Sequence, residues 1–244
     1  MTDYKFDDEL NISLVRGIER GYSDYAEVRM KKRDELLVSA AYAWVKGNHI
    51  EDQVAREVQN KGLGFQKEKA GYTWEYLSFN DPKKKSLLLI KNADIIKGKK
   101  SNPVLNAKAS DNYLVELSKI NGDIDFGKIT GNEQGSLKLF DFPEYRSIDN
   151  INIKDYNLFY ILTYSIDPET KILSAIDLWM PEYKSGSQVE MAKVDSLTKY
   201  LGNTGADINL GAIEELVNVP EEEFSGTQEE FGYKVVDKEA EEEA

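Results

Sequence analysis

The chain contains no cysteine and only one histidine among its 244 residues. The lack of cysteine excludes thiol nucleophiles, iron–sulfur clusters and zinc–thiolate sites. One imidazole cannot supply a site that needs two, and no serine lies in a Gly-x-Ser-x-Gly elbow. We therefore expect the histidine, His49, to be a surface residue near the start of a helix rather than half of a nucleophile–base pair.

A phosphate-binding loop and a membrane segment are also missing. Gly62-Leu63-Gly64 follows a predicted helix, which is typical of a helix C-cap, and Gly202-Asn203-Thr204-Gly205 lacks the lysine of a P-loop. No apolar run approaches the ~20 residues that a membrane helix needs. The acidic N-terminus lacks the features of a signal peptide. The sequence thus predicts a cytoplasmic protein that is not a kinase, an ATPase or a dinucleotide-dependent dehydrogenase.

Positive charge is scarce and unevenly placed. The chain has 31 Lys and Arg against 44 Asp and Glu, a formal net charge of -13. Residues 1–122 carry 21 basic and 18 acidic side chains, whereas residues 123–244 carry 10 and 26, a net charge of -16. Residues 219–244 alone hold ten acidic and two basic side chains and few apolar ones. We expect one domain over residues 1–218 and an acidic, flexible tail over 219–244.

Apolar spacing predicts that the chain begins with helices. One is expected over about 8–20, and a second from the capping-box pair Asp24 and Glu27 as far as Trp44, with Leu37, Ala40, Ala41 and Trp44 on its apolar face. A third is expected from Asn48 to near Gly62. Shorter helices are expected after Ser110, over 189–201 and over 208–217.

The rest of the chain alternates like strands. Tyr72–Phe79 and Ser86–Lys91 predict a hairpin, and Leu158–Leu162 is apolar on both faces, as is typical of a central strand. A turn at 167–170 leads to a return strand, Ile172–Met180, which Pro181 should end, and 136–140 is a further candidate strand. The fold class is therefore α+β, with N-terminal helices followed by a mostly antiparallel sheet on which helices pack.

Two hairpins carry an acid and a lysine in the order that restriction-endonuclease-like nucleases use. Such enzymes need two or three carboxylates for Mg²⁺ and a lysine near the attacking water. In the second hairpin the candidate catalytic residues are Asp167, Glu182 and Lys184. In the first hairpin, Asp81 precedes Leu89-Ile90-Lys91, with Glu51 or Glu57 as the helix carboxylate. Leu89 takes the place of the second acid there, so that site would be degenerate.

Single carboxylates and lysine clusters provide other candidates. Asp177 lies in the middle of the return strand, on a face that we expect to be solvated. Lysines beside exposed aromatic rings are what single-stranded nucleic acid binding requires. A nucleic-acid-binding module would use a lysine-rich hairpin, with the candidates Lys83, Lys84, Lys85, Lys99, Lys100 and Trp74. The alternative is a solvated hairpin tip whose aromatic side chains belong to the core.

The leading hypothesis is a protein that binds rather than catalyses. Acidic segments that contain aromatic residues can dock on basic, apolar grooves of a partner. The candidate partner-binding residues are Glu221, Glu222, Glu223, Phe224, Glu229, Glu230, Phe231 and Tyr233. The sequence thus favours a non-enzymatic inhibitor or accessory protein, such as a phage or mobile element encodes, acting on a basic partner such as a nucleic-acid enzyme. This hypothesis requires no metal, cofactor or membrane, whereas the nuclease alternative requires Mg²⁺.

Overall fold

The computed structural model describes residues 4–70, 74–99, 102–105, 112–130, 151–185 and 188–219. The α-helices are α1 (Asp8–Glu35), α2 (Lys46–Val58), α3 (Asn112–Ser118), α4 (Gly127–Thr130) and α5 (Leu210–Glu215). The strands are β1 (Gly64–Ala70), β2 (Trp74–Asp81), β3 (Ser86–Asn92), β4 (Ile96–Lys99), β5 (Asn102–Leu105), β6 (Leu158–Ile166), β7 (Leu173–Ser185) and β8 (Gln188–Ser196). Short 3₁₀ helices are η1 (Ala40–Ala43), η2 (Ala93–Ile95), η4 (Lys119–Asn121), η5 (Ile153–Asp155), η6 (Thr198–Tyr200) and η7 (Leu216–Asn218).

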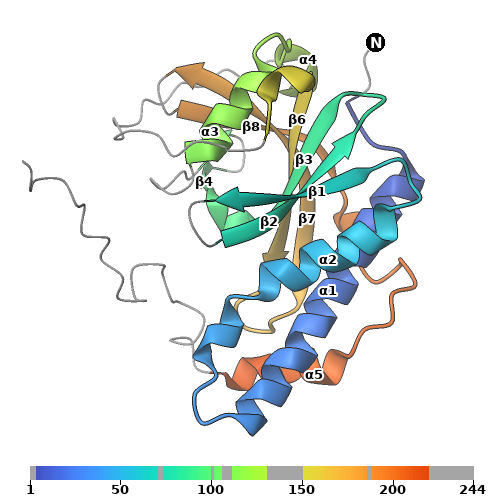
Figure 1. The fold of residues 1–244 in the computed structure, drawn as a ribbon, viewed down its shortest axis with the longest axis vertical. Helices are drawn as coiled ribbons and strands as arrows, with labels where there is room; N and C mark the ends of the chain where they lie inside the picture. The colour runs from blue at the N-terminus through green and yellow to red at the C-terminus, as the bar shows by residue number, and fades with distance from the viewer. Residues whose placement is uncertain are drawn as a thin grey trace, which may run out of the picture.

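One mixed sheet joins all the strands of the described ranges (Figure 1). Its order is β1-β2-β3-β6-β7-β8-β5-β4, and β3 with β6 is the parallel pair. The other neighbouring strands of the described ranges pair antiparallel. This architecture confirms the predicted α+β class, the hairpin of β2 and β3, and the central position of β6.

Helices cover both faces of the sheet. On one face, Leu88, Tyr160 and Leu178 pack with the apolar side of α1 and α2. On the other face, Leu89, Phe159 and Ile161 pack with Leu114 and Leu117 of α3. Because both faces are buried, β3 and β6 are apolar on both sides, which is why their sequences lack a polar alternation. None of the helices in the described ranges has the length and apolar character needed to cross a membrane.

Helix α1 is continuous, so the predicted division between residues 20 and 24 is wrong. Asp7 caps its start by accepting a hydrogen bond from Leu10 N at 2.8 Å, whereas Asp24 lies inside the helix and accepts one from Gln53 Nε2 at 2.6 Å. A Cβ on Gly17 would lie 2.5 Å from Val54 Cα. Gly17 and Gly21, whose Cβ atoms would both collide with the backbone of α2, therefore allow the backbones of α1 and α2 to approach closely.

The predicted second helix also ends earlier than expected. Helix α1 stops at Glu35, residues 36–39 are irregular, and Ala40–Ala43 form only the 3₁₀ turn η1. Leu37 was expected on the buried face of this helix, but it is fully exposed. His49 lies in the first turn of α2, half-buried, with its ring 6.4 Å from that of Tyr25.

Pro181 does not end β7, because a side chain replaces the hydrogen bonds that proline cannot make. The pairing of β7 with β6 stops at Trp179, but its pairing with β8 continues through Pro181. Asn121 Nδ2 donates to Phe159 O and Pro181 O, both at 2.9 Å, and Asn121 Oδ1 accepts from Phe159 N at 2.8 Å. This buried amide satisfies the polar groups that a proline leaves unpaired.

Residues 189–201 form β8 and η6 instead of the predicted helix. Val189 and Met191 face α3, whereas Ala192 and Val194 face α1 and α2. A register shift opposite Leu178 and Trp179 adds one residue to β8 here. The three-residue spacing of Met191, Val194 and Leu197 is thus produced by a bulged strand. Strand β1 was not predicted at all, and the expected strand 136–140 lies outside the described residues.

Candidate functional site

The three candidate catalytic residues of the second hairpin do not come together. Asp167 lies in the turn between β6 and β7 and accepts hydrogen bonds from Thr170 N at 2.7 Å and Glu169 N at 3.1 Å. These bonds, chiefly those from Thr170, lower the pKa of Asp167. Glu182 and Lys184 form an ion pair at the other end of β7. Nine residues of extended strand, roughly 30 Å, separate them from the turn, so this set is not an active site.

In the first hairpin, the candidate lysine, Lys91, interacts with Glu51 of α2. Asp81 is used to close its own turn, accepting from Lys83 N at 2.8 Å and Lys84 N at 3.1 Å. Leu89 is fully buried in the core, and Glu57 pairs with Arg16 and Arg20. Of the carboxylates considered for this hairpin, Glu51 is the one that shares an electrostatic interaction with Lys91.

The carboxyl group of Glu51 lies at the point where strands β2 and β3 separate from each other. Strands β2 and β3 pair only over the three residues next to their turn, as far as Phe79 and Leu88. Beyond that point β2 continues along β1 and β3 continues along β6. Glu51 Oε2 accepts a hydrogen bond at 2.8 Å from Leu77 N, a backbone donor in the part of β2 that has no β3 partner. We call this place, defined by Glu51, Leu77 and Lys91, the strand opening.

Burial dominates the electrostatics of the strand opening. Glu51 is 7% exposed, and the loss of solvation raises its pKa to about 7 against the opposing effects of Lys91 and of Leu77 N–H. Lys91 Nζ lies 4.8 Å from the ring centre of Tyr76 and 5.6 Å from that of Tyr113. Glu51 can therefore exchange a proton near neutral pH beside a cation.

The strand opening lacks the ligands for a metal. Glu68 pairs with Tyr76 across β1 and β2, but it is 2% exposed and accepts from Ser78 Oγ at 3.1 Å. Burial raises its pKa. Within the described ranges, no three acidic or histidine side chains are grouped so that they could hold a metal ion.

Asp177 is half-buried and paired, not solvated as expected. Its Oδ2 lies 2.8 Å from Lys193 Nζ, which also lies 4.7 Å from the ring centre of Trp179. Trp179 Nε1 donates to Thr163 Oγ1 at 2.9 Å. Since this charge already has a cation beside it, Asp177 is best explained as part of the packing of β6, β7 and β8.

The lysine-rich residues do not form one surface. Lys83, Lys84 and Lys85 are exposed in the β2–β3 turn. Lys99 ends β4, and four strands lie between β3 and β4 in the sheet. Tyr76, an aromatic residue of this hairpin, is 3% exposed and stacks on Tyr113, as the alternative with core aromatic side chains predicts. The side chains of Trp74 and Lys99 and all of Lys100 lie outside the described part of the chain.

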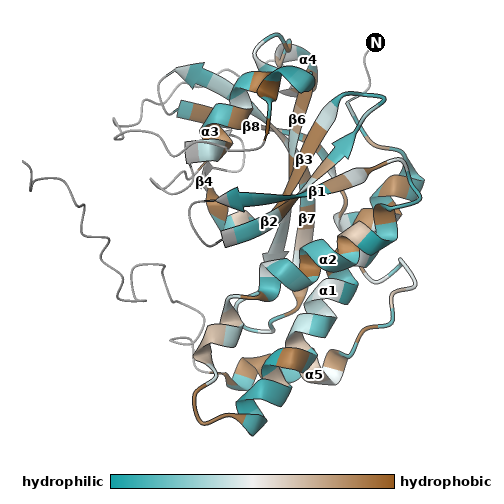
Figure 2. Cartoon of the chain, in the orientation of Figure 1, coloured by the Kyte–Doolittle hydropathy of each residue, from teal (hydrophilic) through white to brown (hydrophobic). Residues whose placement is uncertain are grey.

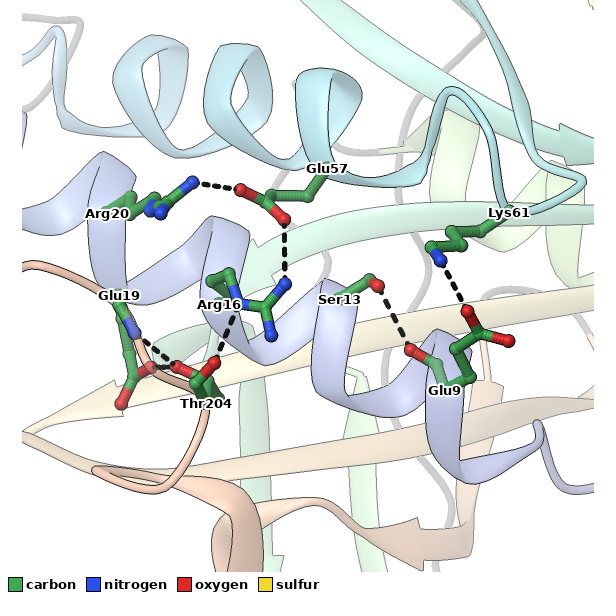
Figure 3. Close-up of polar contacts among 9 residues, drawn as sticks. Glu9, Ser13, Arg16, Glu19, Arg20, Glu57, Lys61 and Thr204 are labelled. Carbon is green, nitrogen blue, oxygen red and sulfur yellow. Dashed lines mark hydrogen bonds and ion pairs between the residues drawn. The ribbon is translucent and has the colours of Figure 1, made fainter.

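A polar network fixes the segment that follows β8 onto α1 (Figure 3). Glu19, which is 3% exposed, accepts from Gly202 N at 2.7 Å and from Thr204 Oγ1. Arg16 Nε donates to Thr204 O at 2.8 Å, and Ser23 Oγ accepts from Asn209 N at 2.8 Å. The side chains of Glu9, Ser13, Arg20, Glu57 and Lys61 continue this polar surface along α1 and α2 (Figure 3). Helix α5 is therefore held in a defined place.

Large apolar residues with exposed side chains are concentrated in the connection that follows α1 and in the segment of α5 and η7. Figure 1 places the end of α1 and helix α5 at the same end of the molecule, and Figure 2 colours much of the connection after α1 as hydrophobic. Of the seven large apolar side chains exposed in the described ranges, five belong to these two segments. They are Leu36, Leu37, Val38, Leu210 and Val217, which we call the apolar end. Sequence reasoning missed it because Leu37 was assigned to a buried helix face. The three successive large apolar residues beyond α1 were the available signal.

The predicted partner-binding residues Glu221 to Tyr233 lie outside the described residues. Val219, at 3% exposure, is the last residue described, and it packs in the core with α1 and α2. Comparison of the chain with protein-family models, with curated proteins and with solved structures finds no match.

Proposed function

We propose that this protein is a non-catalytic cytoplasmic binding protein whose acidic C-terminal part engages a basic protein partner. The observation that carries the proposal is the surface of α5 and η7. Leu210 and Val217 are 56% and 49% exposed there, and Glu214 and Glu215 are exposed beside them. Residues 201–219 contain three acidic side chains and no basic one.

Physical chemistry supports an interface at this place. Each exposed apolar side chain gains about 1.5–3 kcal/mol when it is fully buried against a partner. The flanking carboxylates favour a cationic rim on that partner and speed its association. Glu19 and Asn209 hold the segment against α1, so little conformational entropy is lost on binding. The chain then continues from Val219 into the acidic residues 220–244, which would extend the same charge.

Charge reversal tests the proposal. Glu214→Lys/Glu215→Lys should abolish stoichiometric capture of a basic protein from native extract, since each reversed charge repels the cationic rim. The matched control is Asp52→Lys/Glu75→Lys, which changes the net charge equally at exposed acids on α2 and β2. Capture that is insensitive to the first pair, or equally sensitive to both pairs, would contradict the proposal. A chain ending at Val219 reports separately on Glu221 to Tyr233.

A second candidate, a metal-dependent nuclease or an inactive relative of one, is suggested by the electrostatic interaction of Glu51 with Lys91 in the strand opening. An active enzyme would also need further metal-binding carboxylates, which the described residues do not group there. This candidate predicts Mg²⁺- or Mn²⁺-dependent cleavage of DNA or RNA that disappears in Lys91→Ala. Such cleavage would overturn the binding proposal. If the purified wild-type chain does not cleave DNA or RNA, the role of Lys91 is structural.

A further inference from the structure

The connection that follows α1 exposes three successive large apolar side chains. Leu37 and Val38 are 107% and 83% exposed, and Leu36 is 42% exposed. Contiguous exposed apolar surface is unfavourable in water and marks a place of contact. Arg29, buried beneath the connection, donates from Nη1 to Ser39 O at 3.0 Å and so helps to hold it in one place. We call Leu36, Leu37 and Val38 the tip.

Basic side chains predominate at the end of α1, next to the tip. Residues 29–35 contain four basic and two acidic side chains. Lys31 and Lys32 share one carboxylate, that of Glu35, at 3.8 Å and 2.7 Å. Arg33 forms no ion pair with the residues that the structure describes. The surplus of positive charge beside the tip favours an acidic occupant.

Helix α5 presents the opposite charge at the same end of the molecule. Glu214 and Glu215 are exposed on it, and Figure 1 places α5 near the level at which α1 ends. An acidic segment that leaves α5 is repelled by these two carboxylates and attracted by the basic end of α1. The charges of the two helices therefore direct such a segment toward the tip.

The chain continues from α5 and η7 with a segment of this composition. Residues 220–233, which lie outside the described part of the chain, contain five acidic side chains and no basic one. They also contain Phe224, Phe231 and Tyr233. The segment thus combines carboxylates, which suit the end of α1, with apolar rings, which suit the tip.

The segment is long enough to reach the tip. Asn209, at the start of α5, is tied to α1 because its Nδ2 donates to Glu27 Oε1 at 3.1 Å. The residues between this hydrogen bond and Val219, and between it and Leu37, are mostly helical. Their rises place Val219 and Leu37 within about 45 Å of each other. Residues 220–233 alone can span up to about 50 Å when extended.

We propose that residues 220–233 fold back on their own chain, so that their carboxylates face the basic end of α1 and their aromatic rings cover Leu37 and Val38. The tether keeps the segment near the tip at an effective concentration in roughly the millimolar range, so even weak contacts are populated. Because the contact is weak, it changes the exposure of the tip more than the stability of the fold. It is a property of this chain alone and does not depend on the proposed function.

A spin label on the purified full-length protein tests the inference. The chain has no cysteine, so Ala41→Cys, at an exposed position near the tip, can carry a single nitroxide. We expect the amide NMR signals of residues 221–233 to lose intensity and to recover when the nitroxide is reduced. The same label at Lys83→Cys is the control. Lys83 neighbours Lys84, which lies over Phe6 near the start of α1, a helix length away from the tip. No loss with the first label, or equal loss with both, would overturn the inference.

Charge reversal tests whether the basic end of α1 attracts the segment. Lys31→Glu/Arg33→Glu should abolish the loss of intensity caused by the label at residue 41. The matched control, Lys83→Glu/Lys85→Glu, makes the same change of charge at exposed lysines of the β2–β3 turn and should leave the loss as it is in the wild type. A loss of intensity that survives the first reversal, or that both reversals abolish, would contradict the proposal.

A variant of the segment itself leaves every described residue unchanged. Phe224→Ser/Phe231→Ser should reduce the loss of intensity, since the rings that cover the tip are removed. Unchanged intensities in this variant would show that the tip is not what the segment contacts, and the inference would fail.

A mixed sample distinguishes the segment from a second copy as the occupant. Spin-labelled protein without ¹⁵N is added to ¹⁵N-labelled protein without the nitroxide. A loss of intensity in this mixture would show that the segment binds another molecule, which would overturn the assignment. The outcome for the proposed function is separate. If the label has no effect but Glu214→Lys/Glu215→Lys abolishes capture of a basic protein, the inference fails and the proposed function stands. The reverse pair of results would leave only the inference.

Discussion

At the scale of single residues, the surroundings of Glu51 have opposing effects on the pKa of its carboxyl group. Its carboxyl group is almost completely buried, which favours the neutral form, yet it accepts a backbone hydrogen bond and lies under the influence of Lys91, which favour the charged form. Burial has the larger effect, and the pKa rises to about 7. Glu51 can therefore change its charge state near neutral pH within the folded protein.

This shift makes stability depend on pH in a particular direction. The unfolded chain ionises Glu51 near its ordinary pKa of 4.5, whereas the folded chain does so only near 7. Between these values the folded state holds more protons, so stability falls as the pH rises. Glu51→Gln keeps an acceptor for Leu77 N–H and stays neutral. The variant should gain about 3 kcal/mol relative to wild type between pH 4.5 and pH 7.5, as measured by urea unfolding.

Asp52→Asn provides the control for this measurement. Asp52 neighbours Glu51 on α2, but its side chain is 58% exposed. Its difference from wild type should change little across the same pH range, because this exposed carboxyl group loses little solvation on folding. Parallel stability curves for Glu51→Gln and wild type would show that Glu51 is already ionised well below pH 7 in the folded protein.

The sequence indicated Glu51 as one candidate acid for the first hairpin but could not distinguish it from Glu57. Glu51 and Glu57 lie on the same helix with suitable charge, and only the fold shows that Arg16 and Arg20 take Glu57. The triplet Glu182-Tyr183-Lys184 contained the expected residue types, but the 13-residue length of β7 placed them far from Asp167. Spacing along a chain does not determine distance in space when a strand continues past a proline.

At the scale of elements, the contact between α1 and α2 depends on positions without side chains. A Cβ at Gly17 would meet the backbone of Val54, which cannot move without shifting α2. Alanine has the better helix propensity by about 1 kcal/mol, but the overlap costs more. Gly17→Ala should lower the free energy of unfolding by roughly 1–3 kcal/mol, as measured by urea denaturation.

Gly47 supplies the opposite case within α2. A Cβ at this position meets nothing within 4 Å, so only helix propensity acts. Gly47→Ala should raise the free energy of unfolding by about 0.5–1 kcal/mol. If both alanines stabilised the protein, the two helices would have to pack further apart than described. The close packing of α1 on α2 requires that Gly17→Ala destabilises the protein and that Gly47→Ala stabilises it.

Elements were predictable where one local pattern dominated. Strand β6 was found because Leu158–Leu162 is apolar on both faces, and the hairpin because Asn80-Asp81-Pro82 marks its turn. Strand β8 was missed because a bulge imitates helical spacing, and β1 because its polar, exposed residues resemble a loop. The end of β7 was predicted too early because Asn121, sixty residues before Pro181, donates a hydrogen bond to the Pro181 carbonyl and so replaces the strand pairing that is missing there. No local pattern carries that information.

At the scale of the whole molecule, the C-terminal part is attached to the helices that begin the chain. Ile213, Leu216 and Val219 are at most 4% exposed and belong to the same core as α1 and α2. The buried carboxylate of Glu19 accepts hydrogen bonds from Gly202 N and Thr204 Oγ1 of this segment. Residues 201–219 are thus part of the folded unit, although the sequence alone could only place a boundary near 218 from the change in composition.

Two truncations test where the folded unit ends. A chain ending at Val219 keeps every contact described here, so its free energy of unfolding should match that of the full chain within about 0.5 kcal/mol. A chain ending at Tyr200 loses three buried apolar side chains, each contributing about 1.5–3 kcal/mol, and leaves Glu19 buried without its donors. That loss is comparable with the total stability of an ordinary domain. Urea unfolding followed by tryptophan fluorescence should therefore show a cooperative transition only for the longer chain. A marked loss of stability on ending the chain at Val219 would instead mean that residues 220–244 pack against the domain, and they would then be less available to a partner.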